Sequence, residues 1–352
     1  LHKIPTSKKE VTVKEECKET FRLTLGSYRG AVIPLLILFF GYTCGAIAVF
    51  PLAPDTRVND WFLMDNSIVV LAICVLYVLF SVVWGPNLMK NREPFKLKRV
   101  MIGYNAFQVV LSTWGLCGWF FDYSWTCQAC DFTWSPAGNQ VGWLFFISKI
   151  IDFIDTLFFI LNKKWSNVSV LHIVHHSCMC ISMWYGIKYT PGGHMTLMGF
   201  LNSGVHSIMY TYYLLSAFGP ALRPYLWWKK YLTTIQLVQF VAIFLHAAQL
   251  FVIDCPDVPI GLACWTCIYA VIFFSLFIDF YYRAYLYPKN TGKIAKGSNK
   301  KEEPENEQPL QNGNLKRDAW EMKKNLKNGH IRSPSLTFRL DSCLRERPTS
   351  SQ

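Results

Sequence analysis

Charged residues are scarce in this chain. Asp, Glu, Lys and Arg make up 16% of its 352 residues, whereas about 25% is usual in a soluble domain. Most of these charges lie in the first thirty residues or after Lys289, so the region between them is poorer still. Because 52% of the residues are hydrophobic and form long apolar stretches, the composition predicts an all-α polytopic membrane protein.

Positive charge is missing from one set of predicted loops. A bilayer requires spans of about 20 apolar residues, and seven are predicted: 67–85, 100–121, 141–161, 169–187, 195–215, 231–252 and 262–286. Loops 122–140 and 253–261 contain no Lys or Arg, whereas 86–99 and 219–230 contain several. This asymmetry predicts that the basic loops and the C-terminus are cytosolic. The net charge of +12 therefore indicates orientation and contact with anionic lipid, and no nucleic acid partner.

Cysteines give little support for a zinc site. Cys127 and Cys130 form a Cys-x-x-Cys pair, but the pair lies in a predicted loop. With Cys255 they fall on the lumenal side, where disulfides can persist. Either a disulfide joins loop 122–140 to loop 253–261, or these thiols are unpaired.

The two ends of the chain differ from its centre. The apolar run 31–50 is long enough to span a bilayer, and we interpret it either as an extra N-terminal helix or as a signal-like segment that is later removed. The tail is rich in Lys, Asn, Glu and Pro, which predicts disorder. The expected organisation is an N-terminal extension (1–54), a transmembrane domain (55–288) and a disordered basic cytosolic tail (289–352).

Ionisable and amide side chains within the apolar region concentrate in four spans. Such a residue costs about 2.5–3.5 kcal/mol near mid-bilayer, so it is a candidate functional residue. All four groups fall in the cytosolic half under the predicted topology, which indicates one polar site open to the cytosol. The residues are Lys149, Asp152, Asp155, His172, His175, His176, Asn202, His206, Tyr210, Gln236 and Gln239.

Structural roles are the alternative for several of these residues. Lys149 can form an internal ion pair with either Asp, His206 can be a packing histidine, and the two glutamines can join helices. His194 and His246 are interpreted as structural. Lys230 stands with other cations at the cytosolic mouth, where it can bind phosphate, although membrane orientation explains its charge equally well.

Histidines are too few for the di-iron chemistry of membrane desaturases, which use about eight in three boxes. The chain has eight in total, but His2 and His330 are in the tails and only one box, HIVHH, is present. One alternative is a zinc site formed by His172, His176 and His206. Another is that the protein is a metal-dependent fatty-acyl oxygenase or desaturase. The favoured hypothesis is a neutral imidazole that attacks an acyl thioester.

Four boxes together are similar to those of a known enzyme family. They are SKIIDFIDT, HIVHH, NSGVHSIMYTYY and KKYLTTIQLVQ, and DTRVNDWFLMDN, NREPF, PGGH and RPYLWWKKYLT match as well. From about Asp55 to Tyr287 the chain resembles the very-long-chain fatty acid elongases (the ELO family), which are membrane 3-ketoacyl-CoA synthases. One position departs from the pattern, because Asp152 stands where the family usually has Glu.

The resemblance implies an acyltransferase that condenses a long-chain or very-long-chain acyl-CoA with malonyl-CoA. The products are 3-ketoacyl-CoA, CO2 and CoA, and this is the first step of fatty acid elongation. The implied fold has seven core transmembrane helices, six in an inverted barrel and one outside. The implied catalytic residues are His172, His175, His176 and His206, with His175 carrying the acyl group. The implied supporting residues are Lys149, Asp152, Asp155, Asn202, Tyr210, Gln236, Gln239 and Lys230.

The resemblance also implies surroundings and partners. It implies a lumenal disulfide between Cys127 and Cys255, and residence in the endoplasmic reticulum membrane. No cofactor is expected beyond the substrates acyl-CoA and malonyl-CoA. Expected partners are membrane lipid, the ketoreductase, dehydratase and enoyl reductase of the elongation cycle, and a second copy in a homodimer.

Overall fold

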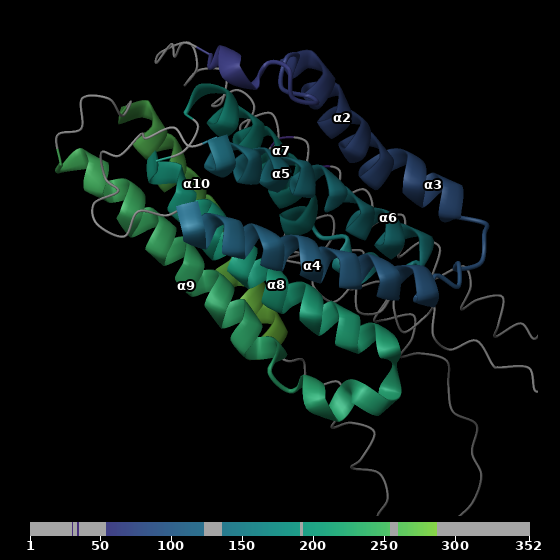
Figure 1. Ribbon diagram of the computed structural model, residues 1–352. Coiled ribbons are helices and arrows are strands. Elements are labelled where there is room, and N and C mark those ends of the chain that lie inside the picture. Colours follow the sequence, from purple (N-terminus) through teal and green to yellow (C-terminus); the bar gives the residue numbers. More distant parts are fainter. Residues whose placement is uncertain are drawn as a thin grey trace, which may run out of the picture.

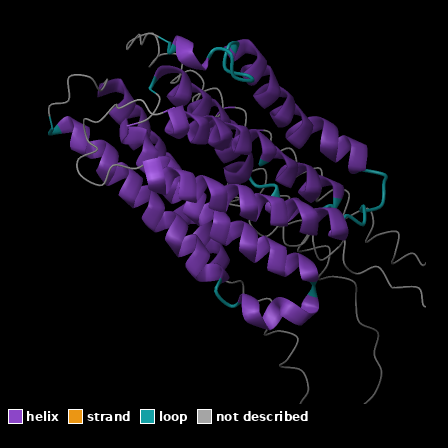
Figure 2. Cartoon of the chain, viewed as in Figure 1, coloured by secondary structure: helices purple, strands orange, loops and turns teal. Residues whose placement is uncertain are grey.

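The computed structural model describes residues 54–122, 136–190, 193–253 and 260–286, together with Gly30 and Pro34. All regular secondary structure in these ranges is helical (Figure 2). The predicted disulfide cysteines, the tail 289–352 and, apart from those two single residues, the extension 1–53 lie outside the described residues.

Helices occupy each of the seven predicted spans. Their bounds are α2 Ser67–Leu79, α3 Gly85–Met89, α4 Lys98–Asp122, α5 Pro136–Ile151, α6 Phe153–Leu161, α7 Val170–Tyr189, α8 Thr196–Phe218, α9 Lys229–Ala248 and α10 Ile260–Tyr281. A π-helical segment, Phe80–Trp84, joins α2 to α3, and another, Tyr282–Leu286, extends α10. Short 3-10 helices lie at Thr56–Val58, Trp165–Asn167, Gly193–Met195, Pro220–Leu226 and Gln249–Phe251.

One prediction about these helices is wrong in detail. The span 141–161 was expected as one helix, but it divides into α5 and α6 at Asp152. At the junction the N–H of Asp155 donates to the carbonyl of Asp152 at 3.1 Å, a tighter i to i−3 bond than an α-helix uses. The break therefore falls among the polar residues of the site.

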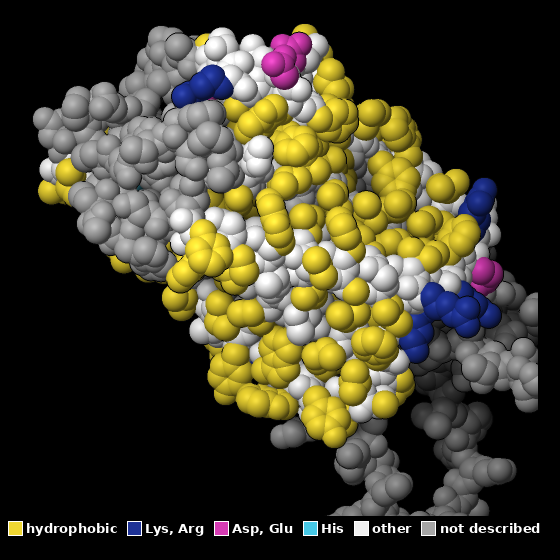
Figure 3. All heavy atoms as spheres, in the orientation of Figure 1, with side chains coloured by type: hydrophobic (Ala, Val, Ile, Leu, Met, Phe, Trp, Pro, Cys, Tyr) yellow, Lys and Arg dark blue, Asp and Glu magenta, His cyan; other side chains and the backbone are white. Residues whose placement is uncertain are grey.

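Four helical segments are long and apolar enough to cross a membrane. They are Ser67–Met89, Lys98–Phe121, Pro224–Phe251 and Ile260–Leu286. The face in Figure 3 is covered mainly by hydrophobic side chains, with Lys and Arg toward its ends. The protein is therefore a polytopic membrane protein. The helices that carry most of the predicted site, α5 to α8, are not among the four. The division at Asp152 leaves α5 and α6 too short to span a bilayer alone, and polar residues lower the hydropathy of α7 and α8.

Six of the helices pack in a closed circuit (Figure 1). Along it α4 contacts α8, α8 contacts α9, α9 contacts α10, α10 contacts α7, α7 contacts α5, and α5 contacts α4. Between α4 and α8 the approach depends on Gly199, because a Cβ there would lie 2.5 Å from the ring of Trp119. Outside this circuit, α2 packs on α7 and α3 packs on α6.

Candidate active site

The start of α7 sets the position of the three histidines in the HIVHH box. Ser169 caps the helix, its hydroxyl accepting a bond from the N–H of His172 at 3.1 Å. Within the helix, the ring centres of His172 and His176 lie 4.3 Å apart, and those of His175 and His176 lie 5.4 Å apart. The three imidazoles therefore form one contiguous group.

The three rings differ in their surroundings. His172 is hydrogen-bonded, its Nε2 lying 2.8 Å from the hydroxyl of Thr156 on α6. His176 is buried between the other two rings. His175 meets the edges of aromatic rings on α10, with its ring centre 5.0 Å from that of Phe273 and 6.1 Å from that of Phe277. No hydrogen bond joins its ring to another described side chain, so its lone pair is available for chemistry.

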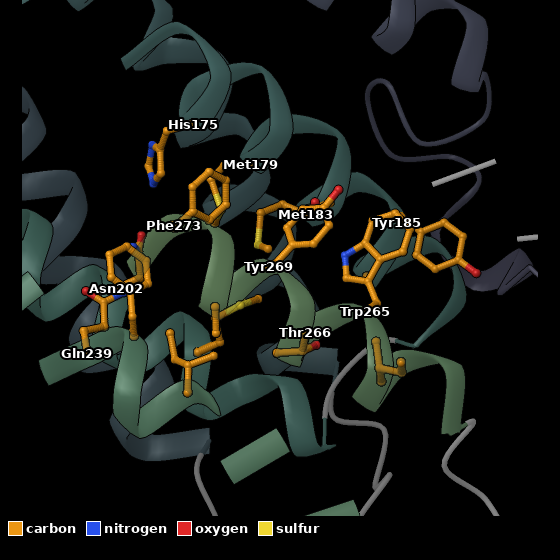
Figure 4. Close-up of a pocket in the computed structure, with 17 residues that line it drawn as sticks. His175, Met179, Met183, Tyr185, Asn202, Gln239, Trp265, Thr266, Tyr269 and Phe273 are labelled. Carbon is orange, nitrogen blue, oxygen red and sulfur yellow. The ribbon is translucent and has the colours of Figure 1, made fainter. Parts of the chain in front are cut away.

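A cavity of about 620 Å³, counting the space at its opening, begins at His175. Figure 4 shows His175 at one end near Asn202 and Gln239, while Tyr185 and Trp265 lie at the other end. Between them the lining is apolar and is contributed mainly by α7 and α10. The side chains labelled along it are Met179, Met183, Thr266, Tyr269 and Phe273. The far end is built of stacked rings, since Trp265 lies 5.5 Å from Tyr185 and 5.0 Å from Tyr269, centre to centre.

This cavity suits an apolar chain with a reactive head. Apolar walls bind hydrocarbon, and a few polar groups at one end fix its orientation. The head of such a chain would lie beside His175, where Asn202 and Gln239 supply amide donors and acceptors.

A second polar group surrounds Asp152. The ammonium of Lys149 lies 3.4 Å from Asp152 Oδ2 and donates to Asn202 Oδ1 at 3.0 Å. His206 Nδ1 lies 3.9 Å from the same Asp152 oxygen. Lys149, Asp152, Asn202 and His206 therefore lie together, and Asn202 links this group to the cavity.

Tyr210 bridges the two aspartates. Its hydroxyl lies 2.8 Å from Asp152 Oδ1 and 2.7 Å from Asp155 Oδ2, and all three side chains are buried. A hydroxyl has one proton, whereas two such contacts to carboxyl oxygens require two. One of the two carboxyl groups must therefore supply the second proton.

Two residues of this group were missed by the sequence analysis. Gln108 on α4 donates to Asp152 Oδ1 at 2.7 Å and to the hydroxyl of Tyr104 at 3.0 Å. The hydroxyl of Tyr104 reaches the carbonyl of Ile151 at 3.3 Å. The available signal was an amide four residues after a tyrosine within an apolar span, which places both on one helix face.

Other predicted residues lie outside these groups. Gln236 is half-buried and its amide contacts the sulfur of Met209 at 3.8 Å. Lys230 is exposed at the start of α9, with its ammonium 5.5 Å from the ring centre of Tyr231. Neither contact reaches the cavity or the Asp152 group.

The alternative zinc site on His172, His176 and His206 requires three ligand side chains close enough to bind one ion. Across the ranges that the structure describes, no three His, Cys, Asp or Glu side chains are grouped as a metal ion would need.

The remaining membrane histidines contact each other. His194 and His246 stack with ring centres 3.8 Å apart and planes 9° apart. His246 Nε2 lies 3.0 Å from the carbonyl of His194. They line a smaller cavity of about 220 Å³.

Comparison with known proteins identifies the family. Residues 62–293 match the ELO family, described as the GNS1/SUR4 family. The chain is 47% identical to a very long chain fatty acid elongase of Aedes aegypti over 240 residues, which cover 66% of this chain and 67% of the relative. It is 43% identical to very long chain fatty acid elongase 7 of Drosophila melanogaster, in a match that covers 68% of this chain and 74% of the relative. It is 42% identical to very long chain fatty acid elongase 7 of Rattus norvegicus, in a match that covers 71% of this chain and 92% of the relative. The chain therefore belongs to the ELO family of very long chain fatty acid elongases.

Proposed function

We propose that this elongase condenses a long-chain or very-long-chain acyl-CoA with malonyl-CoA through an acyl-imidazole on His175. One observation carries the assignment. Of the three histidines in the box, His175 lines the apolar cavity and has no hydrogen bond to another described side chain. A neutral imidazole in that position is a competent nucleophile toward a thioester.

The first half-reaction loads the enzyme. A ring nitrogen of His175 attacks the thioester carbonyl, the C–S bond breaks, and the thiolate of CoA leaves with the proton lost from the ring. The acyl chain then occupies the cavity toward Tyr185 and Trp265. His176 and His206 are assigned to polarise the carbonyl groups of the incoming malonyl unit.

The second half-reaction forms the carbon–carbon bond. Malonyl-CoA loses CO2, and the resulting enolate attacks the acyl carbon held by His175. The C–N bond breaks, and the imidazole leaves after taking up one proton, so each turnover consumes one proton from solvent. Lys149, Asp152 and Asp155 order the neighbouring groups through the ion pair and through Tyr210.

The packing supports a specific architecture. We infer that the closed circuit of α4, α5, α7, α8, α9 and α10 is an inverted six-helix barrel and that α2 is the helix outside it. In the proposed topology the histidine box opens to the cytosol in the endoplasmic reticulum membrane. The sequon Asn167-Val-Ser169 then faces the cytosol and stays unglycosylated. A glycosidase-sensitive mobility shift that Asn167→Gln removes would reverse this topology.

Intact-protein mass spectrometry tests the nucleophile. Purified protein incubated with acyl-CoA alone should gain the mass of one acyl group and release an equal amount of CoA. His175→Ala should abolish this adduct and the later condensation, whereas His246→Ala, in the smaller cavity, should retain the adduct. If His175→Ala traps acyl groups at unchanged stoichiometry, the assignment is wrong.

Labelled malonyl-CoA tests the reaction itself. With a panel of acyl-CoAs of increasing length, the labelled product should be a 3-ketoacyl-CoA two carbons longer than the primer. The same panel reports which lengths and degrees of unsaturation the cavity accepts. Absence of any extended product with every primer would contradict the proposed function.

A further inference from the structure

A second cavity adjoins the one that begins at His175, which we call the acyl cavity. It encloses about 440 Å³, counting the space at its opening, and is lined by residues of α4, α5, α7 and α8. Three residues line both cavities: Met183, Gly186 and Met198. Met183 stands partway between His175 and Trp265 in Figure 4. The two cavities therefore share part of one wall.

This shared wall is open at Gly186. A Cβ built there would have no atom within 4 Å beyond its chain neighbours and the backbone of its own helix. Gly199, which also lines the second cavity, differs, because a Cβ there would lie 2.5 Å from the ring of Trp119. The side chains of Met183 and Met198 are unbranched and flexible, so they can move aside. The missing side chain of Gly186 thus leaves space between the two cavities.

The depth of Gly186 sets the length of chain that reaches it. Gly186 follows His175 by eleven residues in α7, which is about 16 Å along the helix axis. An extended chain advances about 1.2 Å for each covalent bond, as it does in an extended backbone, so about fourteen bonds cover this depth. The acyl cavity ends near the same level, at Tyr185 and Trp265. A longer chain therefore needs further space.

The second cavity contains a buried polar group without a partner. Asn139 on α5 lines the cavity and is 3% exposed, and its side-chain nitrogen has no hydrogen-bond partner among the residues that the structure describes. Two hydroxyls of the same wall are paired, since Thr190 donates to the carbonyl of Gly186 at 3.1 Å and Thr196 donates to that of Gly193 at 2.7 Å. An unpaired buried amide is unfavourable, and a ligand group that pairs with it removes this cost.

The chemistry of the wall selects the kind of ligand group. A hydroxyl suits Asn139 in either orientation of the amide, because a hydroxyl both donates and accepts. A carboxylate does not suit it, since an unpaired buried charge is costly. No Lys, Arg or His is found among the described residues that line this cavity.

We propose that the second cavity receives the far end of acyl chains longer than about fourteen carbons, and that Asn139 binds a hydroxyl group carried there. The substrate class is an acyl-CoA with a hydroxyl at its ω-end. This inference rests on the proposed function, because the chain extends into the second cavity from a head held at His175.

Competition between two primers tests the recognition. Equal amounts of ω-hydroxyoctadecanoyl-CoA and octadecanoyl-CoA, supplied with labelled malonyl-CoA, give two extended products. Their ratio at low conversion is the ratio of the two kcat/KM values, and it does not depend on how much of the enzyme is folded. Asn139→Leu preserves the approximate size of the side chain but removes the amide. It should lower the ratio of hydroxylated to plain product about tenfold, because the hydroxyl loses its partner.

Three controls locate the effect. With ω-hydroxydodecanoyl-CoA and dodecanoyl-CoA, which are too short to reach Gly186, Asn139→Leu should leave the ratio unchanged. Thr190→Val removes from the same wall a hydroxyl that already has a partner, so it should change the octadecanoyl ratio less than about twofold. Gly186→Leu fills the open space, so it should lower the octadecanoyl ratio as Asn139→Leu does and also lower the preference for octadecanoyl-CoA over dodecanoyl-CoA.

The outcomes separate this inference from the proposed function. An unchanged octadecanoyl ratio in Asn139→Leu would overturn the inference, as would an equal fall with the dodecanoyl pair. Should Asn139→Leu fail to fold, an unchanged ratio in Gly186→Leu overturns it instead. If plain primers are extended while the ratios do not respond, the proposed function stands without this inference. If the unaltered protein extends none of the primers, the proposed function itself fails.

Discussion

Lys149→Met removes the ammonium that lies beside Asp152 and should be strongly destabilising. The two side chains are 4% and 2% exposed, and the ammonium lies 3.4 Å from the carboxylate. Methionine preserves the length and apolar stem of lysine but leaves the carboxylate without that counter-charge. Removing one partner of a buried ion pair costs about 3–5 kcal/mol.

An exposed ion pair in the same protein provides the control. Arg283 and Asp279 approach to 2.8 Å, but their side chains are 44% and 53% exposed. Exposed pairs of this kind contribute about 0.2–1 kcal/mol. Arg283→Met should therefore lower the midpoint of unfolding several-fold less than Lys149→Met.

Thermal unfolding of the purified protein in detergent is the assay, with tryptophan fluorescence as the signal. The double variant Lys149→Met/Asp152→Asn removes the uncompensated charge as well, so it should recover most of the lost stability. It should remain inactive, because the group that orders Asn202 is gone. The reasoning is refuted if Lys149→Met is no more destabilising than Arg283→Met, or if the double variant is no more stable than Lys149→Met alone.

Four further predictions use other features. Gly199→Ala forces a methyl group against Trp119, so it should lower the free energy of unfolding by about 1–3 kcal/mol in an unfolding titration. Gly103→Ala is the control, because a Cβ at that position has open space around it, and it should be neutral or slightly stabilising. The second proton between the aspartates predicts an infrared carbonyl band of a protonated carboxylic acid, which should disappear in Asp155→Asn; a spectrum identical to that of the unaltered protein would contradict it. Asp152→Glu should keep measurable condensation because it preserves the counter-charge, and Asp152→Asn should not. Treatment with a metal chelator should leave the rate of condensation unchanged, and a loss restored by added iron or zinc would favour an oxygenase.

The helical segments could be predicted from the sequence because their signal is local. A run of about 20 apolar residues indicates a span wherever it occurs, and each of the seven predicted spans contains helix. The division at Asp152 could not be predicted in this way. It depends on partners from other helices, Gln108 and Tyr210, which lie 44 and 58 residues away in the sequence.

The site could be predicted in outline because its signal is also local. Charged and amide residues in apolar spans are conspicuous, and Asp152, Asn202 and His206 do converge. The rotation of the helix explains why the spacing of the two glutamines in the sequence was misleading. Gln236 and Gln239 are three residues apart, or about 60° around the helix, so Gln239 lines the cavity while Gln236 meets Met209.

The polar residues carried by α5 to α8 have a consequence for biogenesis. Each of these segments, emerging alone from the ribosome, carries polar groups that partition poorly into lipid. Their stable insertion depends on neighbours already present: α4 precedes α5 and α8 in synthesis and contacts both. Mutations that weaken the α4 surface should therefore be detected first as retention at the insertion machinery and rapid degradation, before any defect in catalysis can be measured.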